Sequence, residues 1–434
     1  MIETSPPATL TLRSQRRKVY TIFAIVLTNV LGAGVVIPTL PLYAKDLFNA
    51  TAIDAGYFTA LFYVAQMAAA PWLGRLSDRI GRRPVLIVSQ LGTVLSFALF
   101  IFANPIGRLL ERTGLTFGFA TGLLILYVAR ILDGLTGGNI TAAQAYLTDI
   151  IHEEGERTQA LAFIRLAFGL GLVFGPAFGA VLLNINLLAP FVGAATITSI
   201  TVILTVLVLH ESLPPEARKH AREQPARLGF GWQAVTRNPN VGLILTLAFI
   251  VSVNIAAISA IFPLYADTII YRGELSEALV ARNVGYMLSV LGLTVAATQL
   301  LFLRPLLKRF SRPDLIIASM ALALISVTGL SLATRPGLIT LILMPAAAAY
   351  GIGVPCGEAL LVRIGQGAKS GQLLGLFQSV NSSAYIIGPI VGGYLFVGHP
   401  RAPFIAGMAI SLCSIGVAIV LKRRLSPESQ LTQP

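Results

Sequence analysis

Long apolar runs separated by short polar segments occupy almost the whole chain. A helix needs roughly 20 apolar residues to cross about 30 Å of hydrocarbon. Runs of this length occur twelve times, at 19–43, 56–73, 85–104, 117–142, 160–183, 190–209, 239–263, 283–303, 314–334, 337–362, 371–397 and 402–421. The pattern therefore predicts an all-α membrane protein with twelve transmembrane helices.

The second half of the chain repeats the first. The sequence around Tyr43 returns at Tyr265, and the polar segment 74–84 returns at 304–313, with offsets of 222 and 230 positions. The glycine-proline segment 175–179 returns 213 positions later. Offsets this similar indicate two copies of one helical unit, an arrangement common in secondary transporters. We therefore predict two pseudo-symmetric six-helix bundles.

Composition and the placement of basic residues indicate the topology. The chain is 55% hydrophobic and 12% charged, whereas soluble domains carry roughly 25% charged residues. With both termini in the cytoplasm, inner segments hold 23 Lys and Arg residues and outer loops hold seven, as the positive-inside rule requires. We expect bundles at 1–209 and 239–434, a cytoplasmic linker at 210–238, a short cytoplasmic tail, and insertion in an inner (plasma) membrane.

The rest of the composition argues against several other functions. The net charge of +13 comes from basic residues in short segments at span ends, so anionic lipid headgroups explain it better than nucleic acid does. Cys356, Cys413 and the four histidines have no metal-ligand spacing. Metalloprotease, nucleophile-elbow and phosphate-loop motifs are absent from the sequence. We therefore expect no enzyme activity, cofactor or metal site.

The segment between spans two and three carries charges flanked by glycines. An aspartate lies there among several arginines, and such a cluster can hold one conformation by charge pairing and then release it. A plain basic loop that sets topology is the alternative. The spacing resembles the G-x-L-x-D-R-x-G-R-R/K hallmark of the major facilitator superfamily. The resemblance implies a gating role for Gly74, Asp78, Arg79, Gly81, Arg82 and Arg83.

Two further motifs narrow the resemblance. Residues 127–138 resemble a helix-four motif with an intramembrane arginine, and residues 171–180 resemble the helix-five motif G-x-x-x-G-P-x-x-G-G. Close packing of small residues is the alternative for the second motif. Together they are similar to the twelve-span drug:proton antiporter family, which includes tetracycline and multidrug exporters. The resemblance implies a gating role for Gly171, Gly175, Pro176 and Gly179.

Charges at membrane depth are costly and mark function, and the main ones expected there are Arg130, Asp133 and Glu358. Arg130 and Asp133 share a helix face, so they either serve proton coupling or neutralise each other. The family resemblance implies proton transfer for Arg130. Glu358 follows a glycine- and proline-rich turn that would admit water, so it is a candidate proton carrier. Pairing with Arg363 is the alternative.

One position departs from the family. Many drug:proton antiporters carry Asp in helix one where this chain has Asn29, and an amide cannot carry a proton. Proton coupling is then left to Asp133, Glu358 or Asp149. We expect Asp149 in the charge network around Asp78, the alternative being a solvated helix end.

Polar and aromatic residues at membrane depth are candidates for the substrate site. For each of them an interhelical hydrogen bond or simple packing is the alternative. The candidates for a central cavity are Asn29, Phe62, Tyr63, Gln66, Asn139, Gln144, Asn254, Phe262, Gln378 and Asn381.

These expectations combine into one functional hypothesis, which is alternating-access export of small amphipathic or drug-like compounds by proton antiport. A metabolite, sugar or lipid carrier is the alternative that Asn29 favours, and a membrane sensor without transport is the second. We expect a small-molecule substrate, a lipid bilayer around the protein, the proton gradient as energy source, and a monomer, because one chain holds both halves.

Overall fold

A computed structural model describes residues 12–114, 120–137, 139–151, 153–216, 218, 238–365 and 370–425. Every regular element in these residues is a helix. The N-terminal bundle contains α1 (Leu12–Phe48), α2 (Ala52–Ile80), α3 (Arg82–Arg112), α4 (Thr121–Thr136), α5 (Asn139–Ile150), α6 (Glu154–Leu182) and α7 (Ala189–Val208).

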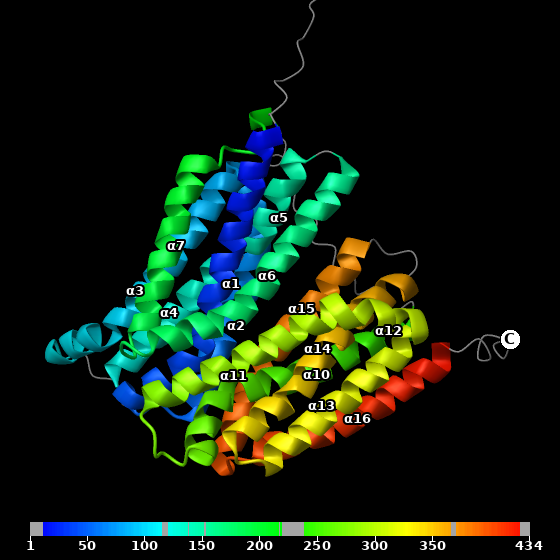
Figure 1. Cartoon of the computed structure of the whole chain (residues 1–434). Helices are drawn as coiled ribbons and strands as arrows, with labels where there is room; N and C mark the ends of the chain where they lie inside the picture. The colour runs from blue at the N-terminus through cyan, green and yellow to red at the C-terminus, as the bar shows by residue number, and fades with distance from the viewer. Residues whose placement is uncertain are drawn as a thin grey trace, which may run out of the picture.

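The C-terminal bundle contains α10 (Pro239–Tyr265), η1 (Ala266–Ile270), α11 (Glu277–Ala297), η2 (Thr298–Phe302), α12 (Leu303–Arg309), α13 (Arg312–Leu332), α14 (Pro336–Ile364), α15 (Ser370–Gly398) and α16 (Ala402–Leu425). Figure 1 shows the two bundles side by side, with the helix axes of one tilted relative to those of the other. Contacts between the bundles run mainly through α2 with α15 and α6 with α11. The all-helical, two-bundle fold that the sequence predicts is confirmed. The division at 210–238 stays a prediction, because most of that segment lies outside the described residues.

Nine of the described helical stretches are long and apolar enough to cross a membrane. The predicted spans at 56–73, 117–142 and 160–183 are the three that are missing from this set, and they fall on α2, on α4 with α5, and on α6. These helices carry polar or charged residues within their length or have only one short apolar stretch, such as 166–182 in α6. The described residues therefore support nine of the twelve predicted spans by length and hydropathy alone.

The polar segments are shorter than the sequence predicted, because the helices continue through them. Segment 74–84 was expected to be a loop, yet α2 extends to Ile80 and α3 begins at Arg82. Only Gly81 interrupts the two helices, with a φ of +114° that favours glycine. In the same way α12 covers most of 304–313, and η1 continues α10 into the predicted loop after residue 263.

Local sequence signals explain several helix starts. The Thr51 hydroxyl accepts a hydrogen bond from the Asp54 N–H, and the Asp54 carboxylate accepts one from the Thr51 N–H, which makes a capping box for α2. Ser311 caps α13 through the Asp314 N–H. Helices α10, α13 and α14 each carry a proline in the first turn, where its missing N–H costs nothing.

One tyrosine hydrogen bond occurs in both bundles. The Tyr43 hydroxyl donates to the Phe100 carbonyl oxygen over 2.9 Å. The Tyr265 hydroxyl donates to the Leu330 carbonyl oxygen over 2.7 Å. The donors are 222 positions apart and the acceptors 230. These are the offsets of the sequence repeat, so the repeat is one of structure as well.

A serine hydrogen bond repeats in the same way. Ser96 Oγ donates to Ala129 O over 2.8 Å, and Ser326 Oγ donates to Ile342 O over 2.7 Å. The donors are 230 positions apart and the acceptors 213. The three offsets therefore align α1 with α10, α3 with α13, and α4 with α14.

Glycine-proline segments on α6 and α15 bring helix backbones into direct contact within each bundle. A β-carbon at Gly175 would lie 2.7 Å from the Leu31 carbonyl oxygen of α1, and one at Gly388 would lie 2.5 Å from the Val253 carbonyl oxygen of α10. Neither distance leaves room for a side chain. Helix α6 thus packs on α1 as α15 packs on α10, as expected for helices that associate by close packing in lipid.

The next residue of each segment contacts the opposite bundle. The Pro176 carbonyl oxygen lies against Gly285 of α11, and a β-carbon at Gly285 would be only 2.7 Å from that oxygen. The Pro389 carbonyl oxygen lies against Gly56 of α2, where a β-carbon would be even closer to the oxygen. Each glycine-proline segment therefore joins its own bundle to the other.

We expect Gly175→Ala to lower the thermal stability of the purified protein. The added methyl group would force α6 away from α1, which overpacking typically makes unfavourable by about 1–3 kcal/mol. Gly169→Ala in the same helix is the matched control, because a β-carbon there meets nothing within 4 Å. Thermal unfolding followed by circular dichroism should show a lower midpoint for the first variant and an equal or higher one for the second. Equal midpoints for both would contradict the packing argument.

Candidate functional site

A buried ion pair lies in the interior of the N-terminal bundle. Arg130 Nη1 lies 2.9 Å from Asp133 Oδ2 on the next turn of α4, and the two residues are 7% and 8% exposed. Arg130 Nε donates to the Phe58 carbonyl oxygen of α2 over 3.0 Å. The guanidinium also lies over the Phe62 ring, 4.5 Å from its centroid. The pair therefore holds α4 against α2 as well as neutralising itself.

Helix α2, which Arg130 contacts, also contacts the other bundle. Tyr63 follows Phe62 on α2, and its ring lies 4.7 Å, centroid to centroid, from the Tyr385 ring of α15. Tyr350 of α14 lies close enough to interact electrostatically with both tyrosines. Three tyrosines from two bundles thus gather beside the buried ion pair.

Glu358 lies on α14, two turns beyond Tyr350. It is half-buried and interacts electrostatically with Tyr350. Glu358, which the sequence predicted as a proton carrier, therefore interacts with the tyrosine cluster from within the C-terminal bundle. Arg130 reaches the same cluster from the N-terminal bundle, through Phe62 and the adjacent Tyr63.

The predicted substrate residues of the N-terminal bundle have different surroundings. Asn29 on α1 is half-buried, and Gln144 on α5 is exposed. Gln66 Nε2 donates to the Gly137 carbonyl oxygen over 3.3 Å, which joins α2 to the end of α4. The Asn139 side chain lies outside the described residues. Phe62 and Tyr63 are thus the predicted residues that the structure brings to the ion pair and the tyrosine cluster.

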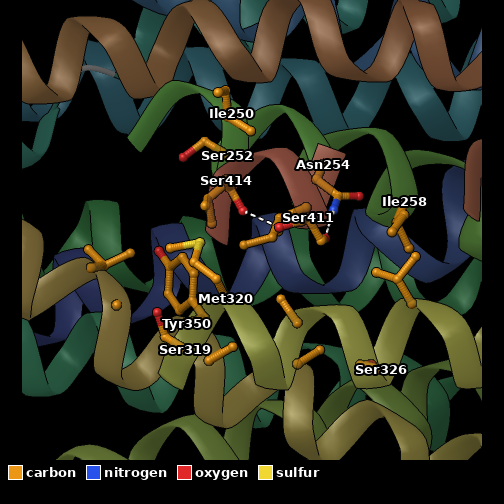
Figure 2. Close-up of a pocket in the computed structure, with 18 of the residues that line it drawn as sticks. Ile250, Ser252, Asn254, Ile258, Ser319, Met320, Ser326, Tyr350, Ser411 and Ser414 are labelled. Carbon is orange, nitrogen blue, oxygen red and sulfur yellow. Dashed lines mark hydrogen bonds between the residues drawn. The ribbon is translucent and has the colours of Figure 1, made fainter. Parts of the chain in front are cut away.

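In the C-terminal bundle, three predicted substrate residues line a cavity inside the bundle. Asn254 Nδ2 donates to Gly407 O and to Ser411 Oγ over 3.2 and 3.1 Å, and Asn381 accepts a hydrogen bond from Ser252. Phe262 is 1% exposed. Figure 2 shows Asn254 and Ser411 at this cavity, whereas Gln378 is exposed on α15. The sequence predicted one central cavity. Of its candidate residues, the structure places Phe62 and Tyr63 at the ion pair and the tyrosine cluster, and Asn254, Phe262 and Asn381 at the cavity of the C-terminal bundle.

Three of the predicted gating residues, Asp78, Arg82 and Asp149, form a charge network at one end of the N-terminal bundle. Arg82 Nη1 lies 2.5 Å from Asp78 Oδ1, and Arg82 Nε lies 3.1 Å from Asp149 Oδ2. Arg83 donates to the Val206 carbonyl oxygen. Arg79 also has a partner, and Gly74 has open space around it. The network thus fastens α2, α3 and α5 to one another.

Polar contacts at the opposite end join the two bundles. We call this the 49–51 end, after the segment between α1 and α2 that lies there. Lys45 Nζ lies 2.6 Å from Asp267 Oδ2 and 3.5 Å from Glu277 Oε1. Arg282 donates to Asn184, and the Tyr57 and Tyr394 hydroxyls lie 3.2 Å apart. The bundles are therefore held together at the 49–51 end.

Comparison with known proteins assigns the fold to a family. The sequence profile of the Major Facilitator Superfamily matches residues 22–281 and 275–434. The chain belongs to this superfamily. As a member it is a multi-pass membrane transporter and not an enzyme.

Relatives within the superfamily cover most of the chain. The class C tetracycline resistance protein of Escherichia coli is 32% identical over 378 residues, covering 85% of this chain and 87% of the relative. Multidrug resistance protein 2 of Bacillus subtilis (strain 168) is 25% identical, covering 95% and 98%. A bacterial homologue of the human lysosomal transporter Spinster, solved in an inward-facing and unoccupied conformation, has the same fold with a TM-score of 0.71 at 13% identity, over 96% of this chain and 100% of that one.

One residue of the gating network in this superfamily member was not predicted. Glu211, at the start of the linker, accepts hydrogen bonds from the Arg82 and Arg83 N–H groups over 2.9 and 3.2 Å. It thereby caps the N-terminus of α3, whose adjacent Gly81 offers no side chain for the purpose. The partners are backbone groups about 130 positions away in sequence, so no motif marks the contact. Nothing in the sequence distinguishes Glu211 from the other two glutamates of the linker, Glu216 and Glu223.

We expect Gly81→Ala to disrupt the gating network and Gly169→Ala to leave it intact. A β-carbon at Gly81 would clash with the Glu211 carboxylate and would need a positive φ, whereas one at Gly169 meets nothing within 4 Å. Thermal unfolding and substrate efflux should both be impaired in the first variant only. Glu211→Gln, which keeps the shape but removes the charge from the helix end, should destabilise by about 0.5–2 kcal/mol. A fully active and stable Gly81→Ala protein would contradict this assignment.

Proposed function

We propose that the protein exports small amphipathic or drug-like compounds in exchange for protons, by alternating access. The observation that supports this proposal most directly is the buried Arg130–Asp133 pair, which contacts α2. The same helix contacts the opposite bundle through Tyr63. The relatives named for tetracycline and multidrug resistance support the substrate class.

The ion pair supplies a means of coupling. While Asp133 is ionised it neutralises Arg130, which is held against Phe58 O and the Phe62 ring. A proton on Asp133 leaves the Arg130 charge uncompensated in a buried site, which favours a different arrangement of α4 on α2. Because Tyr63 lies on the same turn of α2 as Phe62, that rearrangement reaches the contact with Tyr385. Coupling then requires only that proton and substrate prefer different arrangements.

Glu358 is the second candidate for proton exchange, because it adjoins Tyr350 from the C-terminal bundle. Asn29 would contribute hydrogen bonds to substrate rather than a proton site. The transport cycle needs no resident cofactor or metal, and the proton gradient is its energy source. The protein acts as a monomer, because each chain supplies both bundles. Its location is an inner (plasma) membrane.

With both termini in the cytoplasm, as the basic residues favour, the 49–51 end faces outward. The Lys45 contacts then close the outer side, and the Arg82 network faces the cytoplasm. The arrangement of these contacts fits an inward-facing conformation.

A carrier of metabolites, sugars or lipids on the same scaffold is the second candidate. The observation that favours it is Asn29, which replaces the acidic residue of many drug:proton antiporters in helix one. Selective binding of one metabolite class with no response to lipophilic cations would favour this candidate over drug export.

We expect drug-dependent proton movement in liposomes that contain the purified protein. Adding tetracycline or ethidium on one side should release protons that a pH-sensitive dye detects, because drug binding favours the deprotonated acid. Substitution of the coupled carboxylate, by Asp133→Asn or by Glu358→Gln, should abolish the signal. Asp314→Asn serves as the control, because its half-buried carboxylate pairs with Lys422 away from both candidates.

Thermal unfolding should accompany these assays, because removing one partner of a buried pair costs about 3–5 kcal/mol. Drug flux that proceeds at the same rate after the proton gradient is collapsed would exclude proton antiport. It would leave the superfamily assignment and the fold untouched.

We expect Lys45→Ala and Asp267→Ala each to widen the 49–51 end. Asp267 is 3% exposed, so the loss of Lys45 leaves a buried carboxylate without its nearest cation. Spin labels at positions 49 and 274, in a background with both cysteines replaced, would report the distance across this end. Lys422→Ala, which removes the 2.6 Å pair with Asp314 inside one bundle, is the matched control. Unchanged distance distributions in all three variants would show that Lys45 does not hold this end.

A further inference from the structure

A cavity of about 140 Å³ lies inside the C-terminal bundle, away from the buried ion pair. Helices α10, α11, α13, α14, α15 and α16 all contribute to its wall, and every described residue that lines it belongs to this bundle. The site therefore differs from the space between the bundles, where alternating access requires the substrate pathway.

The repeat explains why the cavity exists. The offsets of 230 and 213 positions place Ala323, Leu343, Ala346 and Ala349 where the N-terminal bundle has Thr93, Arg130, Asp133 and Thr136. All four residues of the C-terminal bundle line the cavity. The volume that the ion pair and two threonines fill in one bundle is thus lined by three alanines and a leucine in the other.

Three serine hydroxyls in the wall already have partners. Ser319 donates to Ile316 O, Ser326 to Ile342 O and Ser414 to Ser411 O. Figure 2 shows the Ser414 and Asn254 bonds at the cavity edge. The described lining contains no Asp, Glu, Lys or Arg. Burying a charged or strongly polar group here would therefore be costly.

The wall does suit an aromatic ring. Phe262, Tyr350 and Phe377 line the cavity, and aromatic side chains favour offset or edge contacts with another ring. Met320 also lines the cavity (Figure 2), and a methionine thioether adapts its shape to apolar ligands. An apolar cavity of about 150 Å³ in another protein stays dry and binds benzene, so the size is sufficient for a ring.

We propose that this cavity binds one uncharged ring of a lipophilic molecule. The site lies where the N-terminal bundle has the Arg130–Asp133 pair. The ligand would occupy the volume that those two side chains fill in that bundle. It borders the tyrosine cluster through Tyr350, which lines the cavity and also lies near Tyr63 of the opposite bundle. The assignment concerns binding alone and holds whatever the coupling ion or direction of transport.

Photolabelling of the full chain in liposomes tests the proposal. The probe is 3-phenyl-3-(trifluoromethyl)diazirine, an uncharged ring that partitions into membranes and forms covalent adducts on illumination. Peptide mass spectrometry should find adducts on the cavity residues Met320 and Phe377. It should also find adducts on Leu300 and Leu332, which lie on the surface of the protein, are 70% and 73% exposed, and serve as internal standards.

Filling the cavity should remove only the interior adducts. In Ala323→Leu/Ala346→Leu, adducts on Met320 and Phe377 should fall about ten-fold or more, because a close-packed interior has no room for the probe, while those on Leu300 and Leu332 stay unchanged. Ala346→Val is the milder variant and should give a partial loss. Ala318→Leu, at an exposed position of α13, should have no effect.

The proposal fails if the unmodified protein shows no adducts on the cavity residues, as it would if an acyl chain filled the space. It also fails if those adducts persist in both filled variants. Thermal unfolding and the internal standards establish that each variant is folded.

Discussion

Backbone contact at two glycine-proline segments is the constraint on which this structure depends. Gly175 and Gly388 bring α6 and α15 against α1 and α10, and the carbonyl oxygens of the following prolines meet glycines of the opposite bundle. In lipid no hydrophobic force draws helices together, so such close approach replaces it. Because one short segment serves contacts within and between the bundles, a shift of α6 relative to α1 also alters the interface that alternating access must open.

On this symmetric frame the two bundles have different interiors. The N-terminal bundle contains an ion pair that is 7% and 8% exposed, and it is retained there despite the cost of removing charges from water. The C-terminal bundle has alanines and a leucine at the matching positions, and a cavity results. The duplicated fold thus has a buried ion pair in one bundle and an apolar cavity at the matching place in the other.

The sequence predicted the features that depend on local pattern. Apolar runs and repeat offsets indicated the two bundles. The spacing of Arg130 and Asp133 put them on one helix face, where pairing was the alternative to proton coupling. It failed where a feature depends on distant partners: segment 74–84 is helical except for Gly81, and Glu211 caps α3 through backbone groups far away in sequence. The sequence also did not predict the cavity inside the C-terminal bundle. Ala346 is recognised as smaller than its counterpart Asp133 only when the helices of the two bundles are aligned.

The ion pair and the interface are connected by a short chain of contacts. Arg130 bonds to Phe58 O and lies over Phe62, the adjacent Tyr63 stacks near Tyr385, and Tyr350 joins that cluster to Glu358. Each step is a direct contact or an electrostatic interaction between residues of neighbouring helices. Under the proposed proton exchange, a change of charge at either carboxylate would act on the same tyrosines from opposite bundles. Proton and substrate would then bias a single interface, which is the requirement for coupling two fluxes through one conformational change.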